Sequence, residues 1–477
     1  MRLSRVSAAA PDLGLVRQSP QNTSHQKMTE GRDKGLAIPS GRLNRMVRLT
    51  GLTTALAGSV AAGGARALLS GQRPNLPDLI LTPANAARVA DQLAKMRGAA
   101  LKAGQLLSME ARDVLPDELA HILERLRADA HFMPPGQLKK VLIANWGTHF
   151  MRHFKRFDVR PIAAASIGQV HRARTKDGRD LAIKVQYPGI RGSIDSDIRN
   201  LGLVLKTARL IPDGFDLVRL LEEARQQLHE EADYLREADA QESFRSALAD
   251  DSAFIIPTIH REFTTPDILA MDFVPSVPIE QLVEADQTTR DHVANRLLAL
   301  MLRELFDFHM MQTDPNFANY RYQPERERIV LLDFGATRRF DPLLVDGYRR
   351  LLIACQTGAG ATALGILADI GLTAPDLPDR DKTLLLDLFD IATEPLRTSG
   401  IFDVSRSDLL ARLRAAGLRL AGEQESVHIP PTDSLLLQRK VMGSYLLAER
   451  LRARLDLETL FAPYGASGYE TTLPARA

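Results

Sequence analysis

The sequence of 477 residues lacks the features that mark several classes of protein. It contains one cysteine, Cys355, so disulfide bonds within the chain and zinc sites built from cysteines are both excluded. The formal net charge is only +2, which gives no overall reason to expect a nucleic-acid partner. The low cysteine content suits a reducing compartment, and the shares of charged (25%) and hydrophobic (45%) residues are typical of a soluble globular protein.

The chain also lacks a hydrophobic run long enough to cross a membrane. The nearest candidate is the uncharged stretch between Arg48 and Arg66, which consists mostly of Gly, Ala and Thr. It falls short of the roughly 20 strongly apolar residues that a span needs. Its small residues suit a helix packed closely on protein, and also a contact with a partner or a membrane surface. We therefore expect at most a peripheral membrane protein.

An acid, an amide and a second acid stand at the spacing that protein kinases use to hold magnesium on a nucleotide. They are Asp314, Asn319 and Asp333, the last followed by Phe-Gly. In kinases the first Asp meets the acceptor hydroxyl, while the Asn and the second Asp bind the metal. Taken singly, Asp314-Pro315 is typical of a turn and Asn319 of a helix cap. Together they predict a site for Mg²⁺ with ATP or ADP.

A lysine on a predicted strand supplies the cation for this site. From Phe157 the apolar period is two, which predicts strands over 157–162, 170–175 and 181–185. Lys184 is an awkward residue for an apolar strand, which favours a role in binding phosphate. The loop between the first two strands is expected to cover the phosphates, with contacts from Ala163, Ala164, Ala165, Ser166, Gly168 and Gln169. Kinases carry glycines there, and alanines hold the loop stiffer, so we expect the γ-phosphate to be held differently.

The lysine needs a carboxylate partner on a helix. Residues 195–248 are predicted to be helical and contain Glu231, Asp233 and Glu237. On one helix Glu231 and Asp233 point about 200° apart, so one lysine cannot easily use both. We assign Glu237 to Lys184 and leave the other two acids for a second cation. The alternative for each acid is a solvated helix face.

The remaining chain is predicted to follow a kinase-like order. Apolar runs at 254–259 and 267–273 are expected to be the last strands of a small lobe, with Met271 and Phe273 at a hinge that contacts adenine. From residue 288 the chain is predicted to be helical apart from residues 313–319, which we call the metal loop, and an apolar run of strand length at 328–332 that ends at Asp333. No Ala-Pro-Glu motif follows Gly335 and no long activation segment is available, so the platform that binds peptides in kinases is absent. That absence argues against protein substrates.

The N-terminal part is predicted to form a helical extension. Thr82 and Pro83 open a helix on which Lys102 and Gln105 are neighbours. The predicted divisions are a disordered basic tail (1–35), which a mitochondrial presequence would resemble, a helical extension (36–150), a small lobe with a helical insertion (151–275) and a helical large lobe (276–477).

These residues together resemble the UbiB family of atypical, kinase-like proteins, and within it the coenzyme Q branch of mitochondria and proteobacteria. The resemblance runs from about residue 38 to 463. It rests on Lys-Ala-Gly-Gln at 102–105, the alanine-rich loop, the acids of 231–237 and the two metal motifs. It implies an α+β, bilobal protein-kinase-like fold whose N-terminal extension lies over the active site.

The resemblance also implies roles and partners. Lys102 and Gln105 would occupy the place of a peptide, with Lys102 meeting Glu231 and Asp233, and Asp314 would be the catalytic acid. The activity implied is a Mg²⁺-dependent ATPase of ubiquinone biosynthesis, stimulated by membranes and precursor-like phenols. Partners would be nucleotide, an isoprenoid lipid or quinone precursor, the membrane surface, ubiquinone-biosynthesis proteins and a second copy of the chain, but no nucleic acid. The protein would be cytoplasmic or peripheral in a bacterium, and on the matrix side of the mitochondrial inner membrane in a eukaryote. Two alternatives remain open: a nucleotide-gated lipid chaperone or scaffold without productive turnover, and a kinase for a small molecule or protein.

Overall fold

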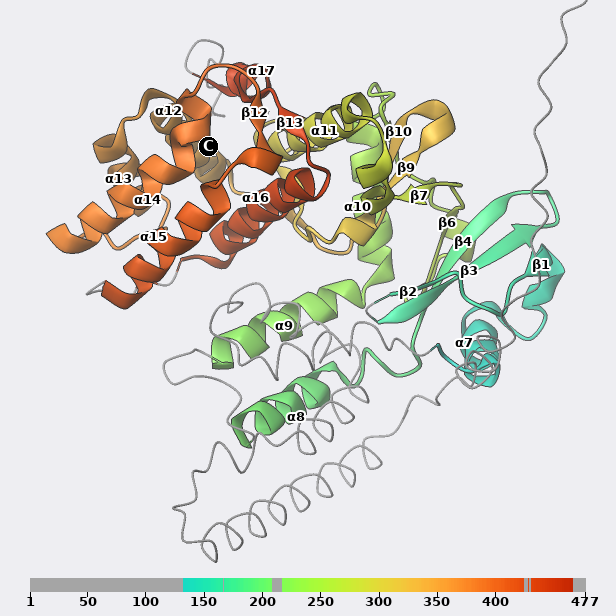
Figure 1. Cartoon of the computed structure of the whole chain (residues 1–477). Helices are drawn as coiled ribbons and strands as arrows, with labels where there is room; N and C mark the ends of the chain where they lie inside the picture. Colours follow the sequence, from blue (N-terminus) through green and yellow to red (C-terminus); the bar gives the residue numbers. More distant parts are fainter. Residues whose placement is uncertain (1–131, 166, 208–216, 424–427, 429, 466–477) are drawn as a thin grey trace, which may run out of the picture.

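In the computed structural model of the protein, the structure describes residues 132–165, 167–207, 217–423, 428 and 430–465. The predicted tail, the small-residue run and the helices with Lys102 and Gln105 lie outside these residues, as does Ser166. Within the described part, the strands of a small lobe lie at one side and a group of helices at the other, with α10 and α11 between them (Figure 1). Over those same ranges no helix has both the length and the apolar character to cross a bilayer.

The small lobe is built on an antiparallel sheet in which β1, β3, β4 and β6 are neighbours in that order and β2 pairs with β3. Its strands are β1 (Phe154–Phe157), β2 (Ala163–Ala164), β3 (Gly168–Thr175), β4 (Asp180–Gln186) and β6 (Ile268–Asp272). Side chains alternate between the faces of a strand, and on β4 Leu181, Ile183 and Val185 enter the core of this lobe. Lys184 consequently lies on the opposite face.

The start of the sheet differs from the prediction. The expected strand over 157–162 is wrong in its bounds, because β1 spans Phe154–Phe157. The aromatic ring of Trp146 packs 5.3 Å from Phe154 and 6.5 Å from Phe157, which holds this segment against α7 (Pro135–Trp146). Pro161 cannot donate to a ladder hydrogen bond, which accounts for the interruption before β2.

The helical insertion forms separate helices, and the expectation of a single stretch over 195–248 is wrong. They are α8 (Ile194–Thr207), α9 (Leu217–Glu231) and α10 (Tyr234–Ala247). Asp233 is the N-cap of α10, and its carboxylate accepts a hydrogen bond from the backbone N–H of Arg236 at 3.2 Å. Glu231 and Asp233 are therefore on two different helix ends, and the angle predicted for one continuous helix does not apply.

Helix α10 joins the cores of the two lobes. Near its start Tyr234 and Ala238 belong to the hydrophobic core of the small lobe. Near its end Phe244 belongs to the core of the large lobe, where its ring lies 4.9 Å from the ring of Phe334. The side chains that face inward on α10 are spaced three or four residues apart, as expected for one helix face. The position of α10 is thus fixed from both lobes.

The large lobe contains strands as well as helices. The predicted strand at 328–332 is confirmed by β10, but the prediction that the rest of the chain after residue 288 is helical outside the metal loop is wrong. A four-stranded sheet has the order β5-β10-β9-β7, and β8 pairs with β11. These strands are β5 (Phe254–Ile255), β7 (Val277–Pro278), β8 (Met310–Gln312), β9 (Tyr320–Gln323), β10 (Arg328–Leu331) and β11 (Thr337–Arg339). The run at 254–259 is not a small-lobe strand, because β5 pairs in parallel with β10. Ile259 alone forms a bridge to Met271 of β6.

The helices of the large lobe pack on this framework. They are α11 (Gln287–Phe306), α12 (Pro342–Thr357), α13 (Gly360–Asp369), α14 (Asp379–Arg397), α15 (Leu409–Glu423), α16 (Thr432–Arg450) and α17 (Leu457–Phe461), with a two-stranded pair β12 (Phe402–Asp403) and β13 (Arg454–Leu455). Asp341 caps α12 by accepting from the N–H of Leu343. Only one short strand, β11, separates Gly335 from α12, consistent with the predicted lack of a long activation segment.

Candidate functional site

The centre of the candidate site is a buried ion pair between the two lobes. The ammonium of Lys184 on β4 lies 2.9 and 3.0 Å from the two carboxylate oxygens of Glu237 on α10. It also lies 3.3 Å from a carboxylate oxygen of Asp333. The side chain of Lys184 is 10% exposed and that of Glu237 1%. The pair predicted from the sequence is therefore present, and it meets the acid of the Asp-Phe-Gly motif.

The two charges influence each other strongly because they lie away from solvent. Burial alone would lower the pKa of Lys184, but the carboxylates of Asp333 and Glu237 outweigh it and hold the pKa well above its usual value. Burial raises the pKa of Glu237 to about 7, against the opposing effect of the Lys184 ammonium. Lys184 is therefore a permanent cation. The carboxylates of Glu237 and Asp333 both contact the Lys184 ammonium and compete for its hydrogen bonds.

Asp333 adopts a backbone conformation that is unusual for a residue with a side chain. Its φ angle is +61°, in the left-handed region. Such a conformation costs roughly 1 kcal/mol or more and is maintained only by the surrounding structure. The backbone N–H of Gly335 donates to its carboxylate at 3.2 Å, and the side-chain amide of Gln312 donates to its carbonyl at 3.1 Å. The side chain is 38% exposed, so an oxygen remains accessible beside Lys184.

Hydrogen bonds hold Asp314 and Asn319 close to the Asp-Phe-Gly segment. The backbone N–H of Leu332 donates to the Asn319 carbonyl at 2.8 Å, which holds Asn319 next to Asp333. The Asn319 side-chain amide donates to the Asp314 carbonyl at 3.4 Å. Thr313 donates its hydroxyl to the Ala336 carbonyl at 2.8 Å, tying the metal loop to the segment after Asp-Phe-Gly. The structure thus brings together the three residues of the predicted metal motif.

The alanine-rich loop forms a tight hairpin at the edge of the small-lobe sheet. Ala163 and Ala164 pair with β3, and the N–H of Ala165 donates to the Gly168 carbonyl at 2.9 Å. A Cβ on Gly168 would overlap the Val185 carbonyl, so the closest approach of the loop to β4 requires glycine. The side chain of Gln169 is fully buried, where it accepts from the N–H of Met133 at 2.7 Å. Its amide thus fixes the entry to α7.

The predicted hinge lies at the end of β6. The side chain of Met271 is buried, and Gln241 of α10 lies 3.9 Å from its sulfur. The backbone N–H of Phe273 donates to the Asp180 carbonyl at 2.8 Å, so this donor is already used within the sheet. The Phe273 ring is covered by the guanidinium of Arg172 at 4.2 Å. A contact of this hinge with adenine would thus use other backbone groups.

The other two acids of the insertion lie beside the site in different roles. The backbone of Glu231 passes 3.8 Å from the position of a Cβ on Gly335, so it borders the Asp-Phe-Gly segment. Asp233 caps α10 and lies 3.9 Å from the guanidinium of Arg191. Arg236 donates to the carbonyls of Gly335 and Thr337 at 2.8 and 2.7 Å. Lys102, which the resemblance places against these two acids, and Gln105, which it places where a peptide would lie, are outside the described residues.

Sequence reasoning missed a set of residues near the metal loop. On α16 Arg439 lies 3.3 Å from the carboxylate of Asp314, and Lys440 donates to the Gln312 carbonyl at 2.7 Å. In the small lobe the Tyr234 ring lies 5.1 Å from the Lys184 ammonium. The α16 residues are more than a hundred positions from Asp314 and had no motif to identify them. Tyr234 directly follows Asp233, and its aromatic character was the one available signal.

The side chains at this site suit a magnesium ion that is shared with a ligand better than a metal ion that is bound only by protein side chains. No group of three or more His, Cys, Asp or Glu side chains in the described ranges is arranged to hold a metal ion. Asp333 and Asn319 offer one carboxylate and one amide oxygen. Mg²⁺ is usually bound by one or two such groups, with phosphates and waters completing its shell. The residues therefore fit a magnesium ion that is shared with a nucleotide.

Comparison with known proteins identifies the family of this chain. A family model described as the ABC1 atypical kinase-like domain matches residues 125–361. The atypical kinase COQ8B, mitochondrial, of Danio rerio is 35% identical over 461 residues, which cover 94% of this chain and 73% of that protein. The atypical kinase COQ8, mitochondrial, of Saccharomyces cerevisiae is 35% identical over 455 residues, covering 94% of this chain and 89% of that protein.

A solved structure supports the fold separately. The complex of Rv3197 with erythromycin from Mycobacterium tuberculosis has a TM-score of 0.54 and 22% sequence identity, and covers 75% of this chain and 90% of that chain. The shared architecture is a kinase-like, mixed α and β fold. Because the COQ8 proteins are related along most of their length, the chain belongs to the ABC1, or UbiB, family of atypical kinase-like proteins.

Proposed function

We propose that this protein is a Mg²⁺-dependent, ATP-binding ATPase of the kinase-like type that supports ubiquinone biosynthesis at a membrane surface. The observation that carries the proposal is that carboxylate oxygens of both Glu237 and Asp333 lie within 3.3 Å of the Lys184 ammonium. In protein kinases the same three types of residue hold the phosphates and the metal. A purely structural ion pair would not need the accessible carboxylate of Asp333.

Each residue has a chemical role in this proposal. Lys184 binds the phosphates of ATP or ADP, and Glu237 keeps its ammonium aimed between the lobes. Asp333 and Asn319 hold Mg²⁺, which neutralises charge on the phosphates when bound. Asp314 orients a water molecule or a small hydroxyl toward the terminal phosphate. The loop 163–169 and the backbone around Met271 and Phe273 cover the nucleotide.

Water is the acceptor that the architecture favours. Only β11 and the turn at Asp341 lie between Gly335 and α12, so the segment that binds peptides in kinases is too short here. The carboxylate of Asp314 is 19% exposed and is already paired with Arg439. We further propose that Lys102 and Gln105 of the extension close the site, with Lys102 facing Glu231 and Asp233.

The assignment to ubiquinone biosynthesis rests on the relatives. Two proteins named COQ8 match nearly all of the chain, and both are named as mitochondrial. We infer from them that the lipid partner is an isoprenoid quinone precursor and that the protein acts beside a membrane. The compartment would be the matrix side of the mitochondrial inner membrane, or the membrane surface of a bacterium.

Phosphate release tests the proposal directly. The full chain would be incubated with γ-labelled ATP and Mg²⁺, with and without liposomes that contain a precursor-like phenol. We expect release that is stimulated by the liposomes and lost in Asp333→Asn. Nucleotide binding without any release that depends on Asp333 would instead support a lipid chaperone or scaffold. Transfer of label to an acceptor, abolished in Asp314→Asn, would identify a kinase.

A further inference from the structure

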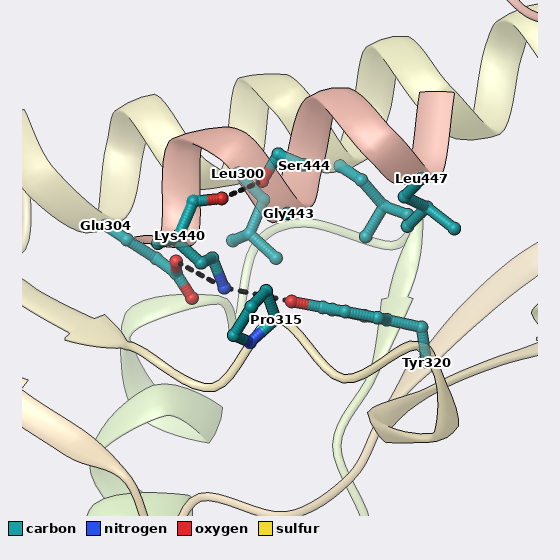
Figure 2. A pocket seen from close by; sticks show the side chains of 9 residues that line it. Leu300, Glu304, Pro315, Tyr320, Lys440, Gly443, Ser444 and Leu447 are labelled. Atoms are coloured by element: carbon teal, nitrogen blue, oxygen red, sulfur yellow. Dashed lines mark hydrogen bonds and ion pairs between the residues drawn. The ribbon is translucent and has the colours of Figure 1, made fainter. Parts of the chain in front are cut away.

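A second buried lysine lies directly behind the metal loop. Lys440 of α16 has a side chain that is 4% exposed, and its ammonium lies 3.3 Å from the carboxylate of Glu304 on α11. The same ammonium donates to the carbonyl of Gln312 at 2.7 Å and to the hydroxyl of Tyr320 at 2.9 Å. Figure 2 shows Glu304, Tyr320 and Lys440 converging beside Pro315. All three groups are thus held by a single cation.

The positions of these partners along the chain are informative. Gln312 is the last residue of β8, immediately before the metal loop, and Tyr320 is the first residue of β9, immediately after it. Lys440 therefore binds both ends of residues 313–319. The side chain of Gln312 extends the connection, because its amide donates to the carbonyl of Asp333 at 3.1 Å. The loop and the Asp-Phe-Gly segment are connected through one network.

Other residues of α16 contact the same loop. Arg439 lies 3.3 Å from the Asp314 carboxylate, and the guanidinium side chain is only 11% exposed. One turn later, a Cβ on Gly443 would overlap the ring of Pro315, so the helix approaches the loop as closely as its backbone allows. A narrow cavity between α11, α16 and Pro315 has room for about one water molecule. Solvent is thus largely excluded from the back of the loop.

A buried ion pair that merely joins two helices would not be expected to do this. For that purpose the contact between Lys440 and Glu304 would suffice. Instead, the ammonium directs its two shortest contacts to the residues that flank the metal loop. Burial raises the pKa of Glu304, while Glu304 and Tyr320 hold the pKa of Lys440 above its usual value, so the lysine keeps its charge and all its donors.

We propose that Lys440 is a positioning residue that fixes the metal loop, so that Asp314 and Asn319 are held in register with Asp333. Helix α16 would then belong to the active machinery although it provides no metal ligand. This inference rests on the proposed nucleotide-dependent function. A displacement of about 1 Å in such a loop can cost on the order of 100-fold in rate.

The test must separate positioning from folding. Lys440→Met alone leaves the Glu304 carboxylate buried without its partner, which is strongly destabilising. We therefore choose the double variant Glu304→Gln, Lys440→Met, which removes both charges but also the bonds to Gln312 and Tyr320. Tyr320→Phe is the milder companion, because it removes one hydroxyl. The control is Lys382→Met, which breaks an exposed ion pair with Asp379 on α14.

The readouts are phosphate release, the Mg²⁺ concentration for half-maximal activity, and the melting temperature with and without Mg²⁺ and ADP. We expect the double variant to melt near the parent, to need at least tenfold more Mg²⁺ and to lose about 100-fold in kcat, with a much smaller change in KM for ATP. Tyr320→Phe should shift the Mg²⁺ requirement in the same direction by less, and Lys382→Met should not shift it.

The outcomes are decisive in each case. Parental Mg²⁺ dependence and kcat in a folded double variant would overturn the inference. If that variant does not fold, parental Mg²⁺ dependence in Tyr320→Phe would overturn it. Failure of the proposed function looks different, because the parent itself would then show no response to nucleotide that depends on Asp333.

Discussion

At the residue scale, the two buried lysines of this protein have the same kind of support. Lys184 contacts Glu237 and lies 5.1 Å from the ring of Tyr234. Lys440 contacts Glu304 and lies 5.6 Å from the ring of Tyr320. Each ammonium therefore keeps its charge in a dry setting with one carboxylate and one aromatic ring. Lys184 also has the accessible oxygen of Asp333 beside it, whereas the further partner of Lys440 is a backbone carbonyl.

This difference predicts different roles for the two lysines. Lys184 is able to bind a ligand, whereas Lys440 holds groups of the protein itself. Lys184 can exchange its contact with Asp333 for a phosphate oxygen, since Asp333 is 38% exposed. Among the described residues Lys440 contacts no carboxylate that is comparably exposed, because the side chain of Glu304 is 3% exposed and the other partners are the Gln312 carbonyl and the Tyr320 hydroxyl. Removal of Lys184 should therefore weaken nucleotide binding itself, whereas removal of Lys440 should act on the loop.

The raised pKa of Glu237 predicts that the stability of the folded protein depends on pH. Its pKa in the folded protein is raised to about 7 from an ordinary value of 4.5, so the folded state retains a proton that the unfolded chain loses. The stability contributed by this proton is fully present below pH 4.5 and is lost as the pH rises to about 7. The shift corresponds to roughly 3 kcal/mol over that window. Above pH 7 the loss should level off.

Denaturant unfolding from pH 4.5 to 8, without Mg²⁺ and with a chelator, measures this effect. The unfolding free energy of the parent should fall relative to that of Glu237→Gln, which cannot titrate. Asp379→Asn, which alters a fully exposed carboxylate, is the matched control. A constant difference between the parent and Glu237→Gln across the range would show that burial does not raise the pKa of Glu237.

At the scale of elements, the alanine-rich loop at 163–169, which we propose covers the phosphates, needs opposite side-chain properties at two of its positions. Gly168 must lack a Cβ because the Val185 carbonyl occupies that space. Ala165 turns the hairpin with a backbone bond to Gly168 and has a Cβ that restricts it. The loop is thus anchored by its glycine and stiffened by its alanines.

Two reciprocal substitutions test this account. Ala165→Gly should loosen the loop and change the ratio of the affinities for ATP and ADP, with a stability loss of up to about 1 kcal/mol. Gly168→Ala should instead strain the sheet and cost roughly 1–3 kcal/mol. Thermal-shift titrations with each nucleotide and Mg²⁺ measure both effects. Unchanged ATP and ADP affinities in Ala165→Gly would rule out the proposed stiffening.

The sequence predicted the elements whose signals are local. The sequence predicts that Lys184 lies on a strand and pairs with Glu237, because an apolar strand that contains one lysine and a helix that contains acids can each be identified from a short stretch of residues. The break at Asp233 was missed because Asp is also tolerated within a helix, and only the bond to the Arg236 N–H identifies it as a cap. The partner of β5 was missed because pairing with β10 joins segments some 75 residues apart, beyond any periodicity.

At the scale of the whole molecule, function depends on contacts between parts that are distant in sequence. Helix α10 joins the cores of both lobes, and α16 reaches the metal loop from the last fifth of the chain. Motif spacing could predict that Asp314, Asn319 and Asp333 lie together, because they are within 20 positions of one another. It could not predict Arg439 or Lys440, whose positions depend on the packing of α16 against α11 and the metal loop.

The pathway assignment is a property of the whole protein and needs a test in cells. Deletion of the gene in its host should lower ubiquinone and cause a precursor to accumulate, since we propose that the protein supports ubiquinone synthesis. Re-expression of the parent should restore ubiquinone, whereas Asp333→Asn at equal abundance should not. Chromatography with mass spectrometry of extracted quinones measures both species. Normal quinone levels in the deletion strain would contradict the assignment to ubiquinone biosynthesis. The nucleotide-dependent activity proposed for Lys184 and Asp333 would then need a different lipid partner.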